Sequence, residues 1–357
     1  MKISDYYTYA PKSKIKAGDA NPNGKYQFYT SSPDESRRCD EYLYDCKATV
    51  MGTGGSATLH YYDGKFSTST DCLTLIPNEK IRAKYLYYFF LANMDVLEAG
   101  FKGAGLKHTS KGYIDNIEIT KIPSLPSQDK IVNLFDELAL RIEKERRQIE
   151  KLDELVKARF VEMFENDNMN EKTIEDVASF CSRGKSPKYV TKSKLKVINQ
   201  ACIYWDRFKF ENVKYNEEDY DGDRIISNND LLICSTGTGT LGRCNIFRAP
   251  DDSRYMADSH VTIIRLNGHI LPEVFKAWFE RPRTQEKLYS DCVSGSTNQI
   301  ELSKEKLKNM NILVPPINLQ KQFASFAKQV DKSKFAVQKS LEKTQLLFDS
   351  LMQEYFG

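Results

Sequence analysis

Residues 125–165 read LPSQDKIVNLFDELALRIEKERRQIEKLDELVKARFVEMFE, and residues 317–357 read INLQKQFASFAKQVDKSKFAVQKSLEKTQLLFDSLMQEYFG. When Gln128 is aligned with Gln320, the two stretches match to their ends without a gap. Neither has glycine or proline in its interior, and these are the residues that most often interrupt a helix. The two stretches are therefore predicted to be long helices and copies of one element.

Both stretches carry an apolar stripe. In the first, apolar residues recur every seven positions, at Phe135, Ile142, Ile149, Val156 and Met163. In the second, the stripe runs through Val330, Val337, Leu341, Phe348, Leu351 and Tyr355. Lys334 and Thr344 interrupt it. This spacing predicts a coiled-coil seam. Each helix would span about 38 residues, or about 57 Å at 1.5 Å per residue. Either helix alone could cover a domain core. The repetition favours two helices that pack antiparallel on each other and hold two similar domains apart.

The repetition extends beyond the helices. The matching segments are 2–6 with 173–177, 75–78 with 264–267, 103 with 295, and 110–111 with 303–304. A chain of 357 residues has room for two or more domains. The polar run ENDNMNE at 165–171 is predicted to be a domain boundary.

Short β-branched and apolar runs predict strands in both halves. They lie at 72–76, 230–234 and 260–264, and shorter ones at 117–119 and 310–312 precede the helices. The chain is thus predicted to be two tandem units, each a mixed α/β domain followed by a helix.

Composition limits the function classes. The sequence has no apolar run near 18 residues and no signal peptide at its polar start, so neither a membrane span nor secretion is expected. Eight cysteines occur without a C-x-x-C pair, which argues against a zinc site or disulfide framework and suits the reducing cytoplasm. The net charge of +3 neither requires nor excludes nucleic acid, because local patches decide.

The glycine motif at 237–242, GTGTLG, fits the G-x-G-x-x-G pattern of dinucleotide-binding sites. Such a site needs a helix that opens at the last glycine, but residues 243–250 are strand-like and end in proline. A glycine-rich hairpin is the favoured interpretation, and a nucleotide-dependent enzyme stays as the alternative. The chain also lacks the [DNS]-P-P-[FYW] loop of an adenine methyltransferase and a cluster of metal-binding carboxylates. His260, at the start of an apolar strand, is interpreted as a core histidine.

Basic segments occur at the same place in both units. Residues 183–196 (RGKSPKYVTKSKLK) carry six basic residues and no acidic one, and their counterpart is PKSKIKAGDANPNGK at 11–25. Such loops can follow a phosphate backbone, or they can be solvated loops without a ligand. The residues predicted to contact DNA are Lys12, Lys14, Lys16, Lys25, Ser31, Ser32, Arg37, Arg38, Lys107, Arg183, Lys185, Lys188, Lys192, Lys194, Arg207 and Arg243. Thr30, Asn199 and Gln200 are further candidates for base reading, while Tyr26, Tyr29, Tyr61 and Tyr62 could contact the nucleotides or belong to the core.

The repeated helix opening Pro…Gln-x-x-(Ile/Phe), its aromatic close, and the segment GSTNQIELSKEKLKNMNILVPPINLQ at 295–320 carry a resemblance. Together they resemble the specificity (S) subunit of type I restriction–modification systems. The match covers the whole chain in the family's order of domain, helix, domain, helix. The first unit departs from the family's pattern at 103–108 and 125–128, where other residues stand.

The resemblance implies an α+β fold with two tandem mixed α/β target-recognition domains. They are joined by two long helices that form an antiparallel coiled coil, with a pseudo-two-fold internal repeat. The expected boundaries are 1–124 for the first recognition domain, 125–168 for the first long helix, 169–316 for the second domain, and 317–357 for the second helix.

In function, the resemblance implies a subunit without catalysis, in which each domain reads one half of a bipartite double-stranded DNA target. The helices would act as a spacer and dock two methyltransferase subunits, and a restriction and translocation subunit would join them. S-adenosylmethionine, ATP and Mg²⁺ would be bound by those partners, and this chain would hold no cofactor or metal. A stand-alone two-domain DNA-binding regulator is the other alternative.

Overall fold

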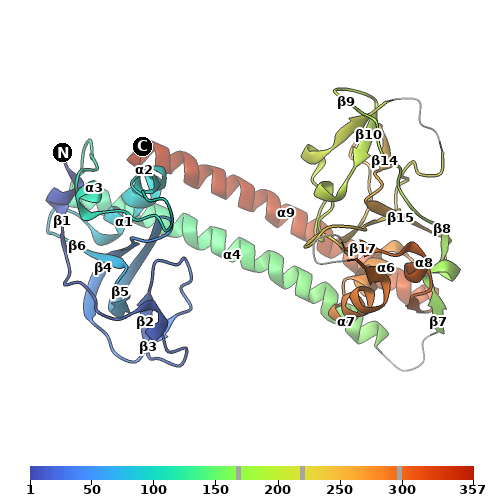
Figure 1. The fold of residues 1–357 in the computed structure, drawn as a ribbon, viewed down its shortest axis with the longest axis horizontal. Helices are drawn as coiled ribbons and strands as arrows, with labels where there is room; N and C mark the ends of the chain where they lie inside the picture. Colours follow the sequence, from blue (N-terminus) through green and yellow to red (C-terminus); the bar gives the residue numbers. More distant parts are fainter. Residues whose placement is uncertain (166–169, 218–221, 296–299) are drawn as a thin grey trace. The chain divides into compact units, whose positions relative to one another are not determined.

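The structure is a computed structural model that describes residues 1–165, 170–217, 222–295 and 300–357 (Figure 1). The chain forms two compact units. The first unit combines Met1–Arg146 with Gln338–Gly357, and the second is Arg147–Val337. Each long helix therefore contributes one half to each unit. Parts of two predicted segments, 166–169 of the domain boundary and 296–299 of the family-like motif, lie outside the described residues.

The first unit is built on a six-stranded sheet with the order β1-β6-β4-β5-β2-β3. The strands are β1 (Tyr7–Tyr9), β2 (Tyr26–Tyr29), β3 (Arg38–Cys39), β4 (Tyr44–Gly52), β5 (Thr58–Thr68) and β6 (Cys72–Pro77). The strand predicted at 72–76 is β6. The long β4–β5 hairpin forms the middle, with Thr49 opposite Tyr61, while β2 joins β5 in parallel. Most strand pairs of this sheet are antiparallel.

Three short helices accompany this sheet: α1 (Ala83–Ala92), α2 (Met94–Ala99) and α3 (Lys111–Asp115). Helix α1 buries Leu86 and Phe90 completely, in one cluster with Leu75 of β6. The same cluster includes Phe135 of helix α4 (Leu125–Phe164) and Phe356 of helix α9 (Ile317–Phe356). The domain core is thus continuous with the long helices.

The second unit contains two four-stranded sheets, ordered β14-β10-β11-β9 and β13-β12-β15-β8. The strands are β8 (Ala178–Arg183), β9 (Tyr189–Val190), β10 (Leu195–Ile198), β11 (Lys214–Asn216), β12 (Leu231–Cys234), β13 (Cys244–Ile246), β14 (Arg254–Ala257) and β15 (Val261–Leu266). The runs predicted at 230–234 and 260–264 are β12 and β15. Central strand β12 is buried at every position, which explains its continuous apolar run.

Two further strand pairs and four short helices complete the second unit. The strands are β7 (Asn170–Thr173) with β18 (Asn311–Val314), and β16 (Val293–Ser294) with β17 (Glu301–Leu302). The helices are α5 (Ile174–Val177), α6 (Pro272–Phe279), α7 (Pro282–Lys287) and α8 (Lys304–Lys308). Strand β18 confirms the run predicted at 310–312. The matching run at 117–119 lies beside the first residues of the chain but forms only an isolated bridge, between Glu118 and Lys2, and not a strand.

The internal repeat is visible in individual backbone hydrogen bonds. Ile3 N donates to Ile117 O (2.9 Å), and Ile174 N donates to Met310 O (3.0 Å) at the matching place. The side-chain amide of Asn78 donates to Asp5 O, and that of Asn267 donates to Asp176 O. Ser110 and Ser303 each cap the short helix that follows them. These matched contacts confirm that the two domains share one fold.

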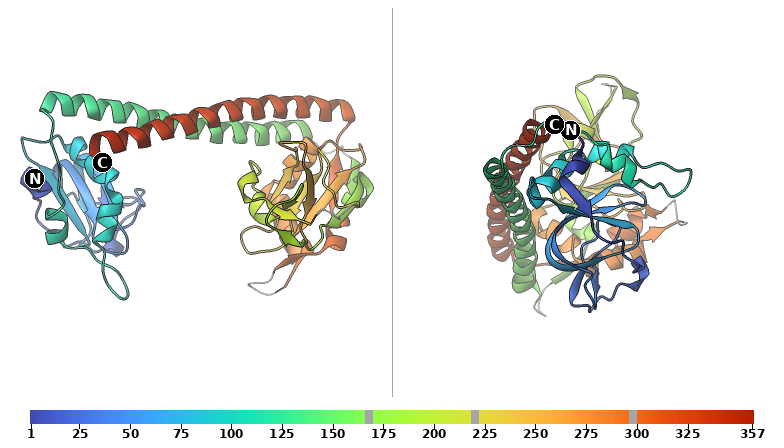
Figure 2. Two further views of the ribbon diagram at one scale, coloured as in Figure 1. Left: turned by 90° about the horizontal axis from the view of Figure 1, so that it is seen from above. Right: turned by 90° about the vertical axis from the view of Figure 1, so that its left-hand side faces the viewer.

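Helices α4 and α9 each span 40 residues, or about 60 Å, and run antiparallel within each unit (Figure 2). In the first unit, the ring of Phe135 lies 5.3 Å from that of Phe348 and 5.6 Å from that of Phe356. In the second unit, Phe160 and Phe164 pack on Phe323, with centroids 5.6 and 5.4 Å apart. Residues early in one helix thus meet residues late in the other, as the seam predicted.

The two polar residues that interrupt the second stripe are accommodated within the seam. Lys334 Nζ reaches Asp153 of α4 at 2.6 Å. Thr344 is 5% exposed, and its hydroxyl donates to Ser340 O. A nearby hydrogen bond links Ser340 to Glu145 of α4 at 2.7 Å. Paired polar groups at these positions avoid the cost of an unsatisfied buried group and fix the register of the helices.

A buried glutamine joins each long helix to the domain before it. Gln128 Oε1 accepts from Arg82 N (2.7 Å), and its Nε2 donates to Lys80 O (3.1 Å) and Pro123 O (2.9 Å). Gln320 repeats the pattern: its Oε1 accepts from Leu271 N (2.8 Å), and its Nε2 donates to His269 O and Pro315 O (2.9 and 2.7 Å). The alignment of these two glutamines thus has a physical basis, because both amides pair the same three backbone groups.

Candidate nucleic-acid interface

Each domain has a polar site where two parallel strands end beside a glycine-containing turn. In the first domain, β2 and β5 are parallel, and Ser69 N donates to Tyr29 O at 2.8 Å. In the second, β10 and β14 are parallel, and Asp258 N donates to Ile198 O at 3.0 Å. Two residues further along lie Ser31 in the first domain and Gln200 in the second. Both stand at the same place in the repeat.

The turn beside each site follows the central strand of its sheet. Thr53 N donates to Asp71 O after β4, and Ser235 N donates to His260 O after β12, each at 2.8 Å. The next residue contacts the site in both domains. Gly54 N donates to Ser31 Oγ at 3.4 Å, and Thr236 Oγ1 donates to Gln200 Oε1 at 3.0 Å. The backbone is therefore repeated, while the side chains that it presents differ.

In the first domain, the structure brings several of the predicted DNA-contacting residues to this site. Ser31 Oγ also donates to Asp71 O at 2.6 Å, and the carbonyl of Lys107 accepts from Gly55 N at 2.8 Å. Thr70 N donates to Ile15 O, so the segment between Lys14 and Lys16 runs past the same turn. The exposed lysines of this part are Lys12, Lys14, Lys16, Lys25 and Lys107.

Arg37, Arg38 and Ser32 make contacts inside the first domain. Arg37 pairs with Asp34 at 3.4 Å. Arg38 donates to the side chain of Gln27 and to the carbonyls of Glu35 and Arg37. Ser32 Oγ accepts from Asp34 N at 3.2 Å. These half-buried groups fix the conformation of the loop that follows β2. If this loop contacts bases, the contacts would come from its solvent-exposed side.

Tyrosines that the sequence offered as nucleotide contacts pack against other side chains of the first domain. Tyr29 is 3% exposed and stacks on the imidazole of His60, with centroids 4.6 Å apart. Burial raises the pKa of the Tyr29 phenol above its usual range. Tyr62 lies against Tyr29 and Phe66. Tyr61 and Tyr62 are half-buried, and the core interpretation applies best to Tyr29.

In the second domain, the basic segment 183–196 begins inside the fold and then becomes exposed. Arg183 ends β8, pairs with Glu301 and donates to Leu302 O at 2.6 Å. Gly184 lies so close to the carbonyls of Ala257 and Asp258 that a Cβ atom would collide with them. The exposed lysines that follow are Lys185, Lys188, Lys192 and Lys194.

Two members of this segment are held by hydrogen bonds and ion pairs. Lys188 N donates to Asn216 Oδ1 at 2.6 Å, while its ammonium lies 3.4 Å from Glu217 in an exposed pair that contributes little. Lys196 pairs with Asp251 at 2.5 Å, and hydrogen bonding to that lysine lowers the pKa of the Asp251 carboxyl. The segment is thus held at Arg183, Lys188 and Lys196, and its other lysines are exposed.

Arg243 contacts the side chain of Tyr204, and Arg207 contacts its backbone. Arg243 lies 5.0 Å from the centre of the Tyr204 ring and donates to Gly239 O at 2.8 Å. Lys209 lies over the same ring at 4.5 Å, and the carbonyl of Arg207 accepts from Tyr204 N at 3.0 Å. Arg207 is exposed, and its guanidinium lies 3.3 Å from Asp206. Two basic side chains, those of Lys209 and Arg243, therefore lie over the Tyr204 ring, and Arg243 also contacts the glycine turn.

The glycine motif at 237–242 forms a hairpin. Strands β12 and β13 on either side of it are antiparallel, with Ile233 opposite Cys244. Gly237 has φ +90°, a conformation that glycine adopts without strain. No helix follows Gly242, so the phosphate-binding helix end of a dinucleotide site is missing from this described stretch. The prediction of a hairpin is confirmed. The glycine motif therefore no longer supports the alternative of a nucleotide-dependent enzyme.

The interpretation of His260 as a core histidine is wrong. Its side chain is exposed, and Nδ1 lies 2.9 Å from Thr236 Oγ1. The apolar run begins one residue later, at Val261, where β15 starts. Sequence reasoning missed this residue because a histidine that immediately precedes a buried strand cannot be distinguished from its first core position. No signal in the sequence marks its role either, because the turn residue that it contacts, Thr236, lies far from it along the chain.

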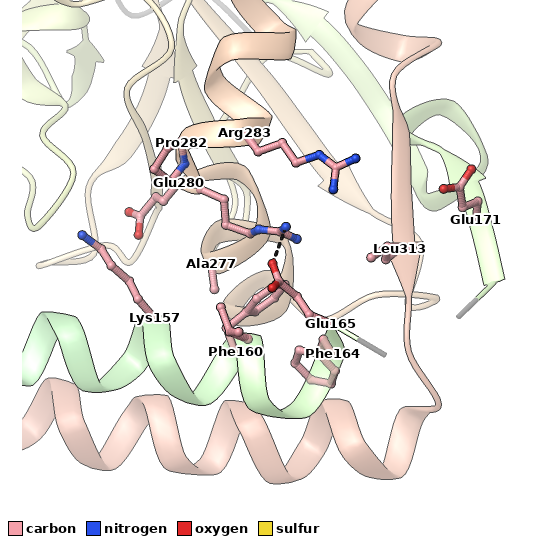
Figure 3. Close-up of a pocket in the computed structure, with 12 residues that line it drawn as sticks. Lys157, Phe160, Phe164, Glu165, Glu171, Ala277, Glu280, Pro282, Arg283 and Leu313 are labelled. Carbon is pink, nitrogen blue, oxygen red and sulfur yellow. Dashed lines mark ion pairs between the residues drawn. The ribbon is translucent and has the colours of Figure 1, made fainter. Parts of the chain in front are cut away.

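A concavity lies beside the last turns of α4 in the second unit (Figure 3). Its volume is about 760 Å³, and Phe160, Phe164 and Ala277 are among the apolar residues that line it. Arg281 pairs with Glu165 at 2.5 Å at its edge. Several apolar side chains outside the helix seam are exposed as well. Leu140 is 51%, Val161 45% and Phe335 71% exposed.

Within residues 1–165, 170–217, 222–295 and 300–357, His, Cys, Asp and Glu side chains form no group able to hold a metal ion. In the same ranges, no helix is both long and apolar enough to cross a bilayer. All eight cysteines are free thiols. Burial raises the pKa of the Cys234 thiol to about 12, so this group is a core side chain and a poor nucleophile.

Comparisons with known proteins agree with this architecture. The family described as "Type I restriction modification DNA specificity domain" matches residues 1–154 and 166–346. Among solved structures, the S subunit of a type I restriction-modification system from M. genitalium is similar over 100% of this chain and 95% of its own length. Its TM-score is 0.70 at 16% identity. A search of curated proteins returned no match.

A chain from a structure of the type I R-M system, on complex assembly and conformational transition, is similar over 100% of this chain and 96% of its own. Its TM-score is 0.52 at 15% identity. At these identities the two likenesses show the fold alone, with its two mixed α/β domains and two long helices. The family match covers most of the sequence in two copies, and the chain therefore belongs to the family of type I restriction modification DNA specificity subunits.

Proposed function

We propose that this chain reads a bipartite target in double-stranded DNA, with each recognition domain reading one half. The observation that carries the proposal is the repeated polar site with different side chains. Ser31 occupies the place in the first domain that Gln200 occupies in the second. Equal backbones with unequal polar groups are what two different half-sites require, because base edges are distinguished by their donors and acceptors.

The exposed lysines around both sites supply the sequence-independent part of binding. Lys14 and Lys16 flank the first site, and Lys188 and Lys192 belong to the exposed segment at the second. Contacts between such side chains and phosphates position a protein on DNA without selecting a sequence. Affinity and specificity would thus come from neighbouring but different residues.

The long helices act as the spacer between the domains and dock two methyltransferase subunits. Support comes from their antiparallel pairing and from apolar side chains that the seam leaves exposed, Phe335 above all. Such residues are costly to leave in water and typical of contact surfaces. The concavity lined by Phe160 and Phe164 is a further place for a partner side chain (Figure 3).

The chain performs no bond chemistry in this proposal. S-adenosylmethionine, ATP and Mg²⁺ are bound by the partner subunits, and a restriction and translocation subunit completes the assembly. The complex works in the cytoplasm, where its DNA lies. Purified alone, the chain transfers no methyl group from S-adenosylmethionine, whereas the mixture with its methyltransferase subunit does.

Exchange of one recognition domain tests the proposal. Residues 169–316 are replaced by the matching domain of a relative, and the methylated positions in DNA from cells that express the whole complex are sequenced. One half of the methylated target changes, and the half that the first domain reads stays the same. A change in both halves would contradict independent reading, and methylation without a bipartite site would contradict the proposal itself.

A further inference from the structure

The site in the second domain is an open concavity of about 540 Å³. It is lined mainly by polar residues, among them Asn199, Gln200, Lys214 and His260, with Tyr189 at its edge. Lys214 Nζ lies 4.9 Å from the centre of the Tyr189 ring, so a cation and an aromatic face stand together there. Two acidic residues, Glu211 and Asp258, also line the concavity.

Asp258 is not available to a ligand. Its carboxylate is 5% exposed and accepts from His260 N at 2.7 Å. Burial raises the pKa of this carboxyl, while the same hydrogen bond opposes that change. The amide oxygen of Asn199 is also occupied, because it accepts from Ala201 N at 2.8 Å. Gln200 and His260 differ from the other residues that line the concavity, because one side chain, that of Thr236, contacts both of them.

A chain of hydrogen bonds orients these two side chains. Thr236 Oγ1 donates its single proton to Gln200 Oε1 at 3.0 Å. The 2.9 Å contact between Thr236 Oγ1 and His260 Nδ1 then requires the imidazole to donate through Nδ1–H. In the neutral ring the lone pair consequently lies on Nε2, which becomes an acceptor.

The two amide protons of Gln200 stay available. Among the residues that the structure describes, Gln200 Nε2 is paired with no acceptor. A donor on Gln200 thus stands beside an acceptor on His260, with Thr236 holding both. In the major groove, adenine presents the complementary pair, because its N7 accepts and its N6 amino group donates.

We infer that Gln200 and His260 are specificity-determining residues that read one adenine edge in the second half of the DNA target. The inference rests on the proposed function and deepens it. Gln200 Nε2 donates to N7, and His260 Nε2 accepts from the N6 amino group. Thr236 is a positioning residue that touches no base, and Lys214 lies at the rim, where the phosphate backbone would pass.

The first domain carries a different arrangement at the matching place. Ser31 Oγ already donates to Asp71 O at 2.6 Å, and glycine at position 54 replaces the threonine. The orienting hydroxyl of Thr236 thus has no counterpart there. A change at Gln200 or Thr236 therefore affects the second half-site and leaves the first as an internal control.

The test uses the complete methyltransferase complex in cells free of other adenine methylation, followed by sequencing of methylated positions. Gln200→Glu replaces both amide donors by acceptors with little change in size. The preference for adenine at one position of the second half falls by about ten- to a hundredfold, the range expected for one base contact. Gln322→Glu, on the exposed face of α9, is the matched control and changes no base.

A second pair of variants keeps the test decisive if Gln200→Glu fails to fold. Thr236→Val removes the orienting hydroxyl and relaxes the same position, whereas Thr236→Ser keeps the hydroxyl and retains the preference. Unchanged base preference in both Gln200→Glu and Thr236→Val overturns the inference. Loss of all methylation in both variants also overturns the inference, because the hydrogen-bond network would then stabilise the fold and not select a base. A wild-type complex without a bipartite site would contradict the proposed function, which is a separate result.

Discussion

Two buried glutamines fix the start of each long helix to its domain. Gln128 is fully buried and satisfies one backbone N–H and two carbonyls. A buried polar group that loses its partner costs about 1–3 kcal/mol, so this amide stabilises the junction strongly for one side chain. The same residue at 320 makes the same contacts, which explains why the two helices align best on their glutamines.

Gln128→Ala is expected to lower the free energy of unfolding of the first unit by about 3 kcal/mol, because three backbone groups lose a partner. Gln148→Ala, on the exposed face of the same helix, makes the same substitution without that loss and changes stability by less than about 0.5 kcal/mol. Urea unfolding of both variants measures the difference. Equal midpoints would show that the amide network does not stabilise the junction.

Exposed lysines in the segment 183–196 are expected to supply affinity without sequence choice. In the assembled complex, changing Lys188 and Lys192 together to Ala weakens binding to all DNA sequences. It flattens the slope of log affinity against log salt by about two, roughly one unit for each phosphate that a lysine no longer neutralises. Fluorescence anisotropy across a salt series measures the slope.

Lys308→Ala is the control for this measurement. Lys308 pairs with Glu175 at 3.1 Å, and helix α5, which contains Glu175, lies near the other end of β15 from the polar site. Its substitution leaves the salt slope unchanged. A double variant with the wild-type slope would mean that Lys188 and Lys192 do not contact phosphate.

At the level of elements, helix α9 presents two phenylalanines in opposite environments. Phe356 is 7% exposed and packs on Tyr85 and Phe135, whereas Phe335 is 71% exposed. One residue belongs to the core of the first unit, and the other to the surface that we assign to a methyltransferase subunit. The spacing of the stripe explains this difference, because Phe335 lies off the line through Val330 and Val337.

Phe356→Ala is expected to cost about 3–5 kcal/mol of stability, the range for a buried phenylalanine. Phe335→Ala leaves stability unchanged and weakens the binding of the methyltransferase subunit at least tenfold. Thermal unfolding and isothermal titration with that subunit separate the two effects. Full-strength binding by Phe335→Ala would place the docking surface elsewhere.

At the scale of the whole molecule, the internal repeat allowed the fold to be predicted from the sequence. The candidate site could be predicted only in part. Two copies of one helix, with matching segments such as 75–78 and 264–267, were enough to predict two similar domains. The joining of residues 338–357 to the first domain's unit follows from the antiparallel helices but has no local signal. Ser31 and Gln200 acquire a role only when parallel strands bring them beside a turn far along the chain. The exposure of His260 was missed for the same reason.

The last prediction concerns the distance between the half-sites. If the helices are the spacer, seven residues inserted after Arg146 and seven after Val337, where the two units meet in sequence, lengthen both helices equally. A heptad keeps the apolar stripe on one face. It adds about 10 Å at 1.5 Å per residue, or about three base pairs at 3.4 Å each. A four-residue insertion rotates the stripe off the seam and serves as the control.

The folded heptad variant is expected to methylate the same two half-sites across a longer gap. Three base pairs also turn the duplex by about 100°, at about 10 base pairs per turn, so the gain is one to three base pairs according to how far the helices twist. Sequencing of methylated DNA measures the gap directly. A heptad variant that folds and still requires the original gap would show that the helices do not set the spacing. The four-residue variant methylates poorly at every gap, because its seam no longer closes.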